Sequence, residues 1–266
     1  MISIFFAFES VSQLISLPVL LFVLAIFPLA TAVYAFNGLA GIGEDSENTR
    51  LSDLKNRKST FIATLIVSLS LSLIFFFLIK PELVVLAITS FLLWCLYSFP
   101  KKGFKYRPVL GTLIHFVSQI IHFTMGYTVI KPLDATGIAI SVYFALLFSA
   151  GHINHELIDR EADEKTGIMT GAVCFGAKKW ETVSFCLFFA AAVYIFVSSL
   201  AVHGMIGCTF PFVIAGFIHT IYKIVSFKRT PDQAKFLAER SFYRVLYFAA
   251  GILFIAAKIF INYFIK

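Results

Sequence analysis

Residues 135–167 read ATGIAISVYFALLFSAGHINHELIDREADEKTG, a long apolar run that ends in a dense group of acidic and histidine side chains. The apolar part, residues 135–153, is long enough to cross the roughly 30 Å hydrocarbon core of a bilayer as a helix, which takes about 20 residues. The segment at its end, from His152 to Gly167, holds seven Asp, Glu or His side chains in sixteen positions. We therefore expect a membrane-spanning helix that leaves the bilayer at a polar site.

The whole chain has the composition of a membrane protein. Of its 266 residues, 59% are apolar and only 14% are charged, whereas about a quarter of the residues in a soluble domain are charged. Apolar runs of sufficient length predict eight membrane-spanning helices. These lie at residues 18–36, 59–79, 83–99, 109–130, 135–153, 182–201, 205–222 and 245–264. Residues 2–17 are shorter and contain Glu9, so we expect them to form either a ninth, first helix or an interfacial helix.

Lys and Arg are distributed unevenly between the connections that join these spans. Eighteen of the 22 basic residues lie in four alternate connections, at residues 37–58, 100–108, 154–181 and 223–244. Because cytoplasmic loops are enriched in Lys and Arg, we expect these four connections to face the cytoplasm. The same rule accounts for the net charge of +7, so the charge does not indicate a nucleic-acid partner. No feature of the sequence indicates an obligate protein partner.

Two of the basic connections also carry polar residues spaced by four. The first begins NGLAGIGED, which contains Asn37, Gly41 and Asp45, and the second contains Asp159 and Asp163 in HELIDREAD. If each membrane helix continues beyond the bilayer, residues four apart share one face. Asp159 and Asp163 would then repel each other and require a cation between them or a proton. Asp45 and Asp163 are 118 residues apart, close to half the chain, which indicates two pseudo-repeat halves whose polar groups face each other.

The donor atoms in these two segments are amide and carboxylate oxygens, without clustered Cys. Such a set favours Mg²⁺, which takes one or two carboxylates and completes its shell with water and substrate phosphate. Lys and Arg bind the remaining phosphate oxygens, so the sequence predicts a diphosphate pocket. The basic residues around it are Arg50, Arg57, Lys58, Lys101, Lys102, Lys105, Arg107 and Lys165. The alternative is that these charges are ordinary solvated side chains of cytosolic loops.

These features resemble the UbiA superfamily of intramembrane prenyltransferases, whose nine helices carry the Asp-rich motifs NxxxDxxxD and DxxxD on cytosolic loops. Here DREAD, from Asp159 to Asp163, matches the second motif, and EKTGIMTGAVCFG and YSFPKKGFKYRP are similar to family segments. The resemblance extends over most of the chain. It implies an all-α, UbiA-like bundle of about nine transmembrane helices around a central cavity, formed by residues 1–266 as one domain. It also implies a polyprenyl diphosphate substrate, bound with Mg²⁺ in an integral membrane protein.

Residue roles follow from the motifs and the resemblance together. We expect Mg²⁺ to be held by Asn37, Asp45, Asp159 and Asp163, with the three carboxylates as the catalytic residues. The expected diphosphate contacts are Arg57, Lys101, Lys102, Lys105 and Lys165.

The first motif departs from the family pattern, because Gly41 stands where its middle Asp is expected. The form NxxxGxxxD resembles a branch of the superfamily that cyclises geranylgeranyl diphosphate, in which double bonds of the prenyl cation attack the cation itself. We therefore expect a membrane-bound terpene cyclase. The alternatives are a prenyltransferase with an aromatic, quinone, haem or lipid acceptor, and a non-catalytic lipid-binding or transport protein on the same scaffold.

Polar residues within the predicted span 109–130 fall on one helical face. Ionisable residues at membrane depth cost about 2.5–3.5 kcal/mol on insertion scales, which suggests a function for them. His115, Gln119 and His122 are therefore candidates for lining the cavity, and the alternative is hydrogen bonding to a neighbouring helix. Lys258, in the last span, is expected to reach toward the interface or to pair with a backbone carbonyl.

Overall fold

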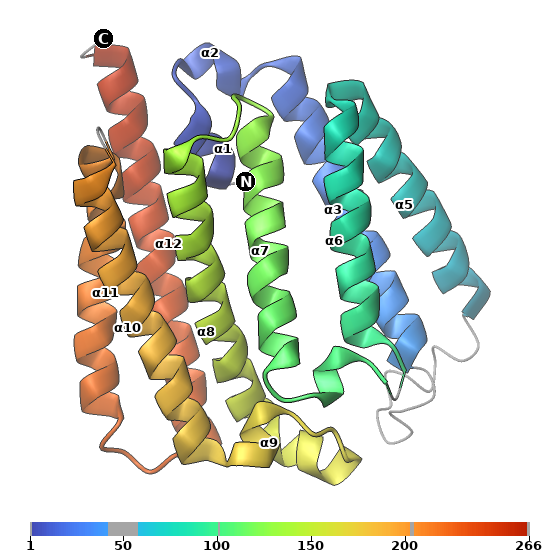
Figure 1. Cartoon of the computed structure of the whole chain (residues 1–266), viewed down its shortest axis with the longest axis vertical. Helices are drawn as coiled ribbons and strands as arrows, with labels where there is room; N and C mark the ends of the chain where they lie inside the picture. The colour runs from blue at the N-terminus through green and yellow to red at the C-terminus, as the bar shows by residue number, and fades with distance from the viewer. Residues whose placement is uncertain (1, 42–57, 101, 203–204, 265–266) are drawn as a thin grey trace.

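The structure, a computed structural model, describes residues 2–41, 58–100, 102–202 and 205–264, and its regular secondary structure over these residues is entirely helical. Long helices packed side by side form most of the molecule (Figure 1). They are α3 (Leu17–Gly41), α5 (Lys58–Ile79), α6 (Pro81–Ser98), α7 (Leu110–Thr128), α8 (Ala135–Thr166), α10 (Ala177–Ala201), α11 (Ile206–Ser226) and α12 (Gln233–Phe264). The short elements are α1 (Ile2–Ala7), α2 (Val11–Leu14), the 3₁₀ turn η1 (Phe104–Tyr106) and α9 (Gly171–Phe175).

Seven stretches of helix in the described residues are long and apolar enough to cross a membrane. They lie at Val11–Gly41, Lys58–Ile79, Pro81–Ser98, Ala135–Thr166, Ala177–Ala201, Thr209–Ser226 and Gln233–Asn262. The predicted all-α, polytopic membrane fold is thereby confirmed, but the count of nine is not. The helix α7 is absent from the seven, and its polar side chains lower its hydropathy, although it runs through the middle of the bundle (Figure 1).

Residues 2–17 form two short helices in place of a further span. The first of them, α1, is buried between α7, α8 and α12, with Phe6 stacked on Phe254 at a centroid distance of 4.1 Å. The Ser3 side chain of α1 packs on Gly126 of α7, where an added Cβ would lie 2.1 Å from the Ser3 hydroxyl. Lys258 Nζ donates to the Phe6 carbonyl at 2.7 Å, which confirms the carbonyl partner expected for this lysine.

One end of the bundle collects the chain segments that carry both motifs. The helices α3, α6, α8 and α11 end at the lower end of the bundle in Figure 1. The same end holds the connection from α6 to α7, which contains η1, and the connection from α8 to α10, which contains α9. We call this end the motif end. Lys80 and Lys131 lie at the opposite end, between α5 and α6 and between α7 and α8.

The helix that carries the second motif has defined caps at both ends. At its start, the Asp134 carboxylate accepts from the Gly137 N–H at 2.8 Å and from the Tyr127 hydroxyl at 2.7 Å. At its end, Gly167 adopts a left-handed conformation with φ of 74°, which glycine tolerates without steric cost. The 32 residues of α8 correspond to about 48 Å of helix, longer than the hydrocarbon core. The expected continuation of this helix into the second motif is observed, since Asp159 and Asp163 lie near its end on the same unbroken helix.

Two buried ion pairs join α10, α11 and the start of α12 near the motif end. Lys223 Nζ lies 2.6 Å from Glu239 Oε2, and Lys235 pairs with Glu181. The second Glu239 oxygen accepts from the Ser226 hydroxyl at 2.6 Å. Each buried ammonium thus has a carboxylate partner, which offsets the large cost of removing a charge from water.

Candidate active site at the motif end

Asp159 and Asp163 project from one face of α8 at the motif end. Asp159 is exposed and Asp163 is half-buried, and the Thr170 hydroxyl donates to Asp163 Oδ2 at 3.3 Å. The charges that act on Asp163 are those of Asp159, Glu156 and Lys105. Two carboxylates one turn apart, with an ammonium nearby, form an oxygen-rich group that is suited to a hard cation.

The Glu156 carboxylate joins α8 to the segment that follows the motif. Its Oε2 accepts from the Trp180 indole N–H at 2.6 Å and from the Gly171 backbone N–H at 3.1 Å. Its Oε1 lies 3.1 Å from His152 Nε2. Gly171 packs so closely on Trp180 that an added Cβ would lie 2.2 Å from the indole ring. Glu156 therefore fixes the position of α9 and of Thr170 beside the two aspartates.

A group of rings stands above the motif in the centre of the bundle. His115 of α7 stacks on His152 of α8, with ring centroids 3.7 Å apart. His115 also packs edge-on against Trp94 at 4.8 Å and Tyr97 at 5.2 Å, both from α6. These rings link α6, α7 and α8 at the level just above the acidic residues.

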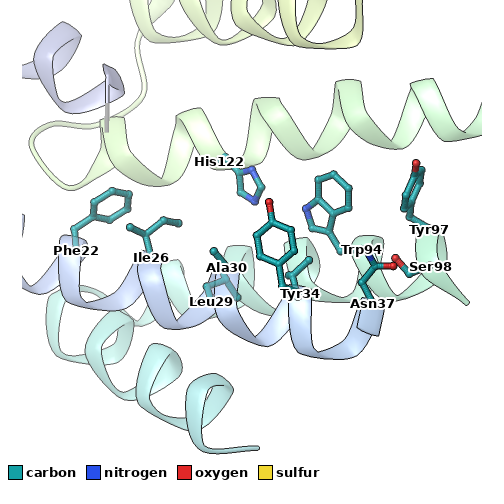
Figure 2. A pocket seen from close by; sticks show the side chains of 11 residues that line it. Phe22, Ile26, Leu29, Ala30, Tyr34, Asn37, Trp94, Tyr97, Ser98 and His122 are labelled. Carbon is teal, nitrogen blue, oxygen red and sulfur yellow. The ribbon is translucent and has the colours of Figure 1, made fainter. Parts of the chain in front are cut away.

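A cavity of about 330 Å³ lies on one side of α7, between α3, α6 and α7. Asn37 lines this cavity, and we call it the Asn37 cavity. Figure 2 shows Asn37, Ser98 and Tyr97 at one end, with Tyr34, Trp94 and His122 lining the part beyond them. His122 Nε2 lies 2.7 Å from the Ser90 hydroxyl of α6, so this histidine both faces the cavity and bonds to a neighbouring helix.

A second cavity, of about 520 Å³, lies between α7, α8 and α12, and we call it the Arg244 cavity. His115, Gln119, His152 and His155 line it from α7 and α8, and Arg244 lines it from α12. The polar face of α7 therefore divides between two cavities: His115 and Gln119 face this one, and His122 faces the Asn37 cavity.

The predicted diphosphate contacts and Asp45 are only partly covered by the described residues. Asp45, Arg57 and Lys101 lie outside the described residues. Lys102 and Lys165 are exposed at the motif end, and the ammonium of Lys105 lies over the Tyr106 ring at 4.8 Å. Within the described ranges, no group of three or more His, Cys, Asp or Glu side chains is placed to hold a metal.

Sequence reasoning missed several residues that the structure brings to this region. Glu156, Tyr97 and the arginines of α12 were not among the candidates. Arg240 and Arg244 belong to the basic connection 223–244 and stand near Glu239 and Lys235, so the sequence did not distinguish them from ordinary charged residues of a cytosolic segment. Glu156 is distinguishable only by its burial, which the sequence does not display.

The chain matches the model of the UbiA prenyltransferase family over residues 1–261. No curated protein sequence matches it. The similar solved structures include a UbiA homologue from Archaeoglobus fulgidus, with a TM-score of 0.77, 20% identity and coverage of 97% of this chain and 91% of that one. The same homologue bound to GPP and Mg²⁺ gives a TM-score of 0.70 at 19% identity, with coverage of 96% and 93%.

A third similar structure is described as concerning digeranylgeranylglyceryl phosphate synthase in membranes. It has a TM-score of 0.71 and 18% identity, and the alignment covers 97% of this chain and 91% of that chain. At these identities the likeness establishes the fold alone. The resemblance inferred from the two motifs is confirmed at the level of the family, while the terpene-cyclase branch stays a prediction.

Proposed function

Because the chain belongs to the UbiA prenyltransferase family, we propose that it ionises a polyprenyl diphosphate with the help of Mg²⁺ and transfers the prenyl group to an acceptor. The observation that carries this proposal is the position of Asn37, which begins the first motif and lines an aromatic cavity. Tyr97 lines the same cavity and contacts the ring of His152, two turns before Asp159 on α8. Tyr97 and His152 thus connect the cavity that Asn37 lines with the helix that carries the second motif.

The residues at the motif end fit Mg²⁺ by the chemistry of their donor atoms. Asn37, Asp159 and Asp163 offer only oxygen, and Mg²⁺ is usually bound by one or two carboxylates together with substrate phosphates. We assign the metal to these residues and to Asp45, which lies outside the described residues. When bound, the ion would supply positive charge that stabilises the departing pyrophosphate.

Basic side chains of the motif end complete the proposed diphosphate site. Lys105 acts electrostatically on Asp163, and Lys102 and Lys165 are exposed at the same end. Arg57 and Lys101, outside the described residues, belong to the same proposal. Lys and Arg bind phosphate oxygens as charge-assisted partners.

We place the prenyl chain in the Asn37 cavity, where aromatic faces stabilise a carbocation. Tyr34, Trp94 and Tyr97 line this cavity together with Phe22, and each aromatic face attracts a cation by about 0.5–2 kcal/mol. In the reaction, the bond between C1 of the prenyl chain and the diphosphate oxygen breaks, and its electron pair leaves with pyrophosphate. The acceptor nucleophile then forms a bond to C1, and its proton passes to the stacked pair His115–His152.

Cyclisation is a second candidate function, favoured by Gly41. This glycine ends α3, and an added Cβ would have no heavy atom within 4 Å, so the site lacks a carboxylate that its space would accept. The form NxxxGxxxD resembles the cyclising branch of the superfamily. In that case a double bond of the prenyl chain replaces the external acceptor, and a proton or water ends the reaction.

Incubation of membranes with Mg²⁺ and geranylgeranyl diphosphate tests these alternatives. Pyrophosphate release that yields a prenylated acceptor only after an acceptor is added supports transfer. A cyclic hydrocarbon or alcohol in the hexane extract without acceptor supports cyclisation. If no prenyl diphosphate of any chain length releases pyrophosphate faster than with Asp159→Ala membranes, the proposed function is wrong and the non-catalytic alternative stands.

We also propose that the motif end faces the cytoplasm, as the distribution of Lys and Arg predicts. Cys174, in α9 at the motif end, is exposed and offers a direct test. A membrane-impermeant maleimide should label Cys174 in inverted vesicles and leave it unlabelled in right-side-out vesicles, with Cys174→Ser as the control. The reverse pattern would overturn this orientation.

A further inference from the structure

The Asn37 cavity is closed at the end away from the motif end, and this closed end has a consequence for the substrate. We propose that Phe22, backed by α1, forms the end wall and limits the prenyl chain to about four isoprene units. The inference rests on the proposed function, because it assigns the chain length of the diphosphate that the motif end would bind.

The end wall consists of close-packed side chains. Figure 2 shows Phe22 and Ile26 at the end of the cavity away from Asn37. Phe22 lines the cavity but is only 1% exposed, and its ring lies 6.0 Å from the ring of Phe76 on α5. The buried cluster to which it belongs continues toward the opposite end of the bundle with Val19, Leu83 and Val129. Because protein interiors pack as densely as organic crystals, a prenyl chain cannot continue straight past Phe22.

The helix α1 supports Phe22 from the side of α7. A Cβ added at Gly126 of α7 would lie 3.2 Å both from the Ser3 Cβ and from the tip of the Phe22 ring, so the two side chains share one small surface. Ile4 of α1 is 1% exposed and belongs to the same cluster as Phe22. A hydrogen bond from Lys258 and a pair of stacked rings hold α1 to α12. The wall is therefore a fixed part of the bundle.

The same short helix stands at the far end of the Arg244 cavity. Ile2 of α1 lines that cavity. Its Cδ1 lies 3.5 Å from the place that a Cβ would take at Gly251, which is further along α12 from the motif end than the lining residue Phe248. A prenyl chain that turned from one cavity into the other would thus meet α1 again.

The distance between the two ends of the Asn37 cavity sets the expected chain length. Asn37 and Phe22 both line the cavity from the single helix α3, and their separation along that helix is about 22 Å. An extended chain advances about 1.2 Å per bond, so four isoprene units of four chain bonds each take about 19 Å and six units about 29 Å. Four units therefore fit between Asn37 and Phe22, and six do not.

The test compares prenyl diphosphates of two to six isoprene units as substrates of the full chain in lipid nanodiscs with Mg²⁺. The quantity is kcat/KM for pyrophosphate release, each value divided by that of the two-unit substrate, which makes the profile independent of the folded fraction. Wild-type protein should lose at least about tenfold between four and six units, because further carbon groups would have to enter a close-packed core. A profile that stays level from four to six units would overturn the proposal.

Two variants should move this limit in opposite directions. Ile26 lines the cavity one helical turn nearer the motif end than Phe22, a shift of about 5 Å that corresponds to one isoprene unit. We expect Ile26→Phe to lose about tenfold between three and four units and to leave the shorter substrates within about twofold. Phe22→Ala removes the wall and should raise the relative value for five units about tenfold.

The control variant is Phe77→Leu, because Phe77 is 63% exposed on α5 and is not one of the described residues that line the cavity. It should keep the wild-type profile. Since Phe22→Ala removes a buried ring and can unfold the protein, Ile26→Phe decides the matter. If Ile26→Phe has the thermal unfolding transition and the chain-length profile of the wild type, the proposal fails.

Retention of the substrates, measured by native mass spectrometry with Mg²⁺, separates this inference from the proposed function. If Ile26→Phe retains the three-unit diphosphate as the wild type does but loses the four-unit one, while neither protein releases pyrophosphate, the proposed reaction fails and the length limit stands. If wild-type protein releases pyrophosphate equally well from every chain length, the proposed reaction stands and the length limit fails.

Discussion

Replacement of Glu156 tests how the motif helix is tied to the segment that follows it. Both hydrogen bonds from Trp180 and Gly171 end on the same oxygen, Oε2. Glu156→Ala leaves two buried donors without a partner, at about 1–3 kcal/mol each, so we expect a loss of about 4 kcal/mol in the free energy of unfolding. In Glu156→Gln the amide oxygen replaces Oε2 and keeps both bonds. The charge assistance is lost, and an amide nitrogen replaces the oxygen that faces His152, so we expect a smaller loss of about 2 kcal/mol.

The assay is unfolding by SDS in mixed micelles, followed by the fluorescence of Trp180. The chain contains two Trp residues, so Trp94→Phe in every variant leaves Trp180 as the single reporter. Glu161→Ala is the matched control, because Glu161 is exposed on the same helix and surface substitutions change stability by about 0.5 kcal/mol or less. The reasoning is refuted if Glu156→Ala costs no more than Glu161→Ala, or if Gln and Ala at position 156 cost the same.

Three further predictions concern the ends of α3 and α8 and the hydrogen bond that joins α1 to α12. Gly41→Asp should fold normally, because the added side chain meets open space, and it should lower the Mg²⁺ concentration that gives half-maximal pyrophosphate release; a thermal unfolding transition well below that of the wild type would contradict the open space. Lys258→Met should lower the free energy of unfolding by about 1–3 kcal/mol, since it leaves the Phe6 carbonyl unpaired, and no change would show that the bond is not needed. Asp134→Ala removes the N-cap of α8 and should cost about 1 kcal/mol. Burial opposes ionisation of Asp134, but bonds from Gly137, Lys131 and Tyr127 outweigh it and lower the pKa of this carboxyl to about 2. A carboxyl with a lowered pKa stabilises the fold above its unfolded-state pKa of about 3.9 and loses that contribution as the pH falls toward 2, so the difference between wild type and Asp134→Ala should be complete at pH 6 and shrink between about pH 4 and pH 2.

The sequence was sufficient to predict the membrane fold and most of its helices. Hydrophobic runs of about 20 residues have few structural solutions other than a spanning helix, so seven of the eight expected spans match the apolar helices. The eighth, residues 109–130, corresponds to α7, whose polar face turns toward two cavities. Residues 2–17 were ambiguous because their burial depends on a close approach to Gly126 and Phe254, which no local pattern encodes.

The site was predictable only in part, for a physical reason. Asp159 and Asp163 are four residues apart, and helix geometry places residues with this spacing on one face, so their common face was apparent from the sequence. Glu156 bonds to Trp180 of α10, and Arg244 lines a cavity beside α7. Such contacts between segments distant in the sequence leave no periodic pattern. The division of the polar α7 face between two cavities likewise depends on the packing of α3 and α12 around it.

The measurement that tests the central claim most directly is pyrophosphate release from geranylgeranyl diphosphate by purified protein in lipid nanodiscs. Wild-type protein should release pyrophosphate with Mg²⁺ and stop when EDTA is added. Asp159→Ala should be slower by about a hundredfold or more, as expected when charge stabilisation of a leaving group is lost, while Glu161→Ala stays within twofold of wild type. Release that persists in EDTA, or an Asp159→Ala rate within a few-fold of wild type, would contradict a metal-assisted reaction at the motif end.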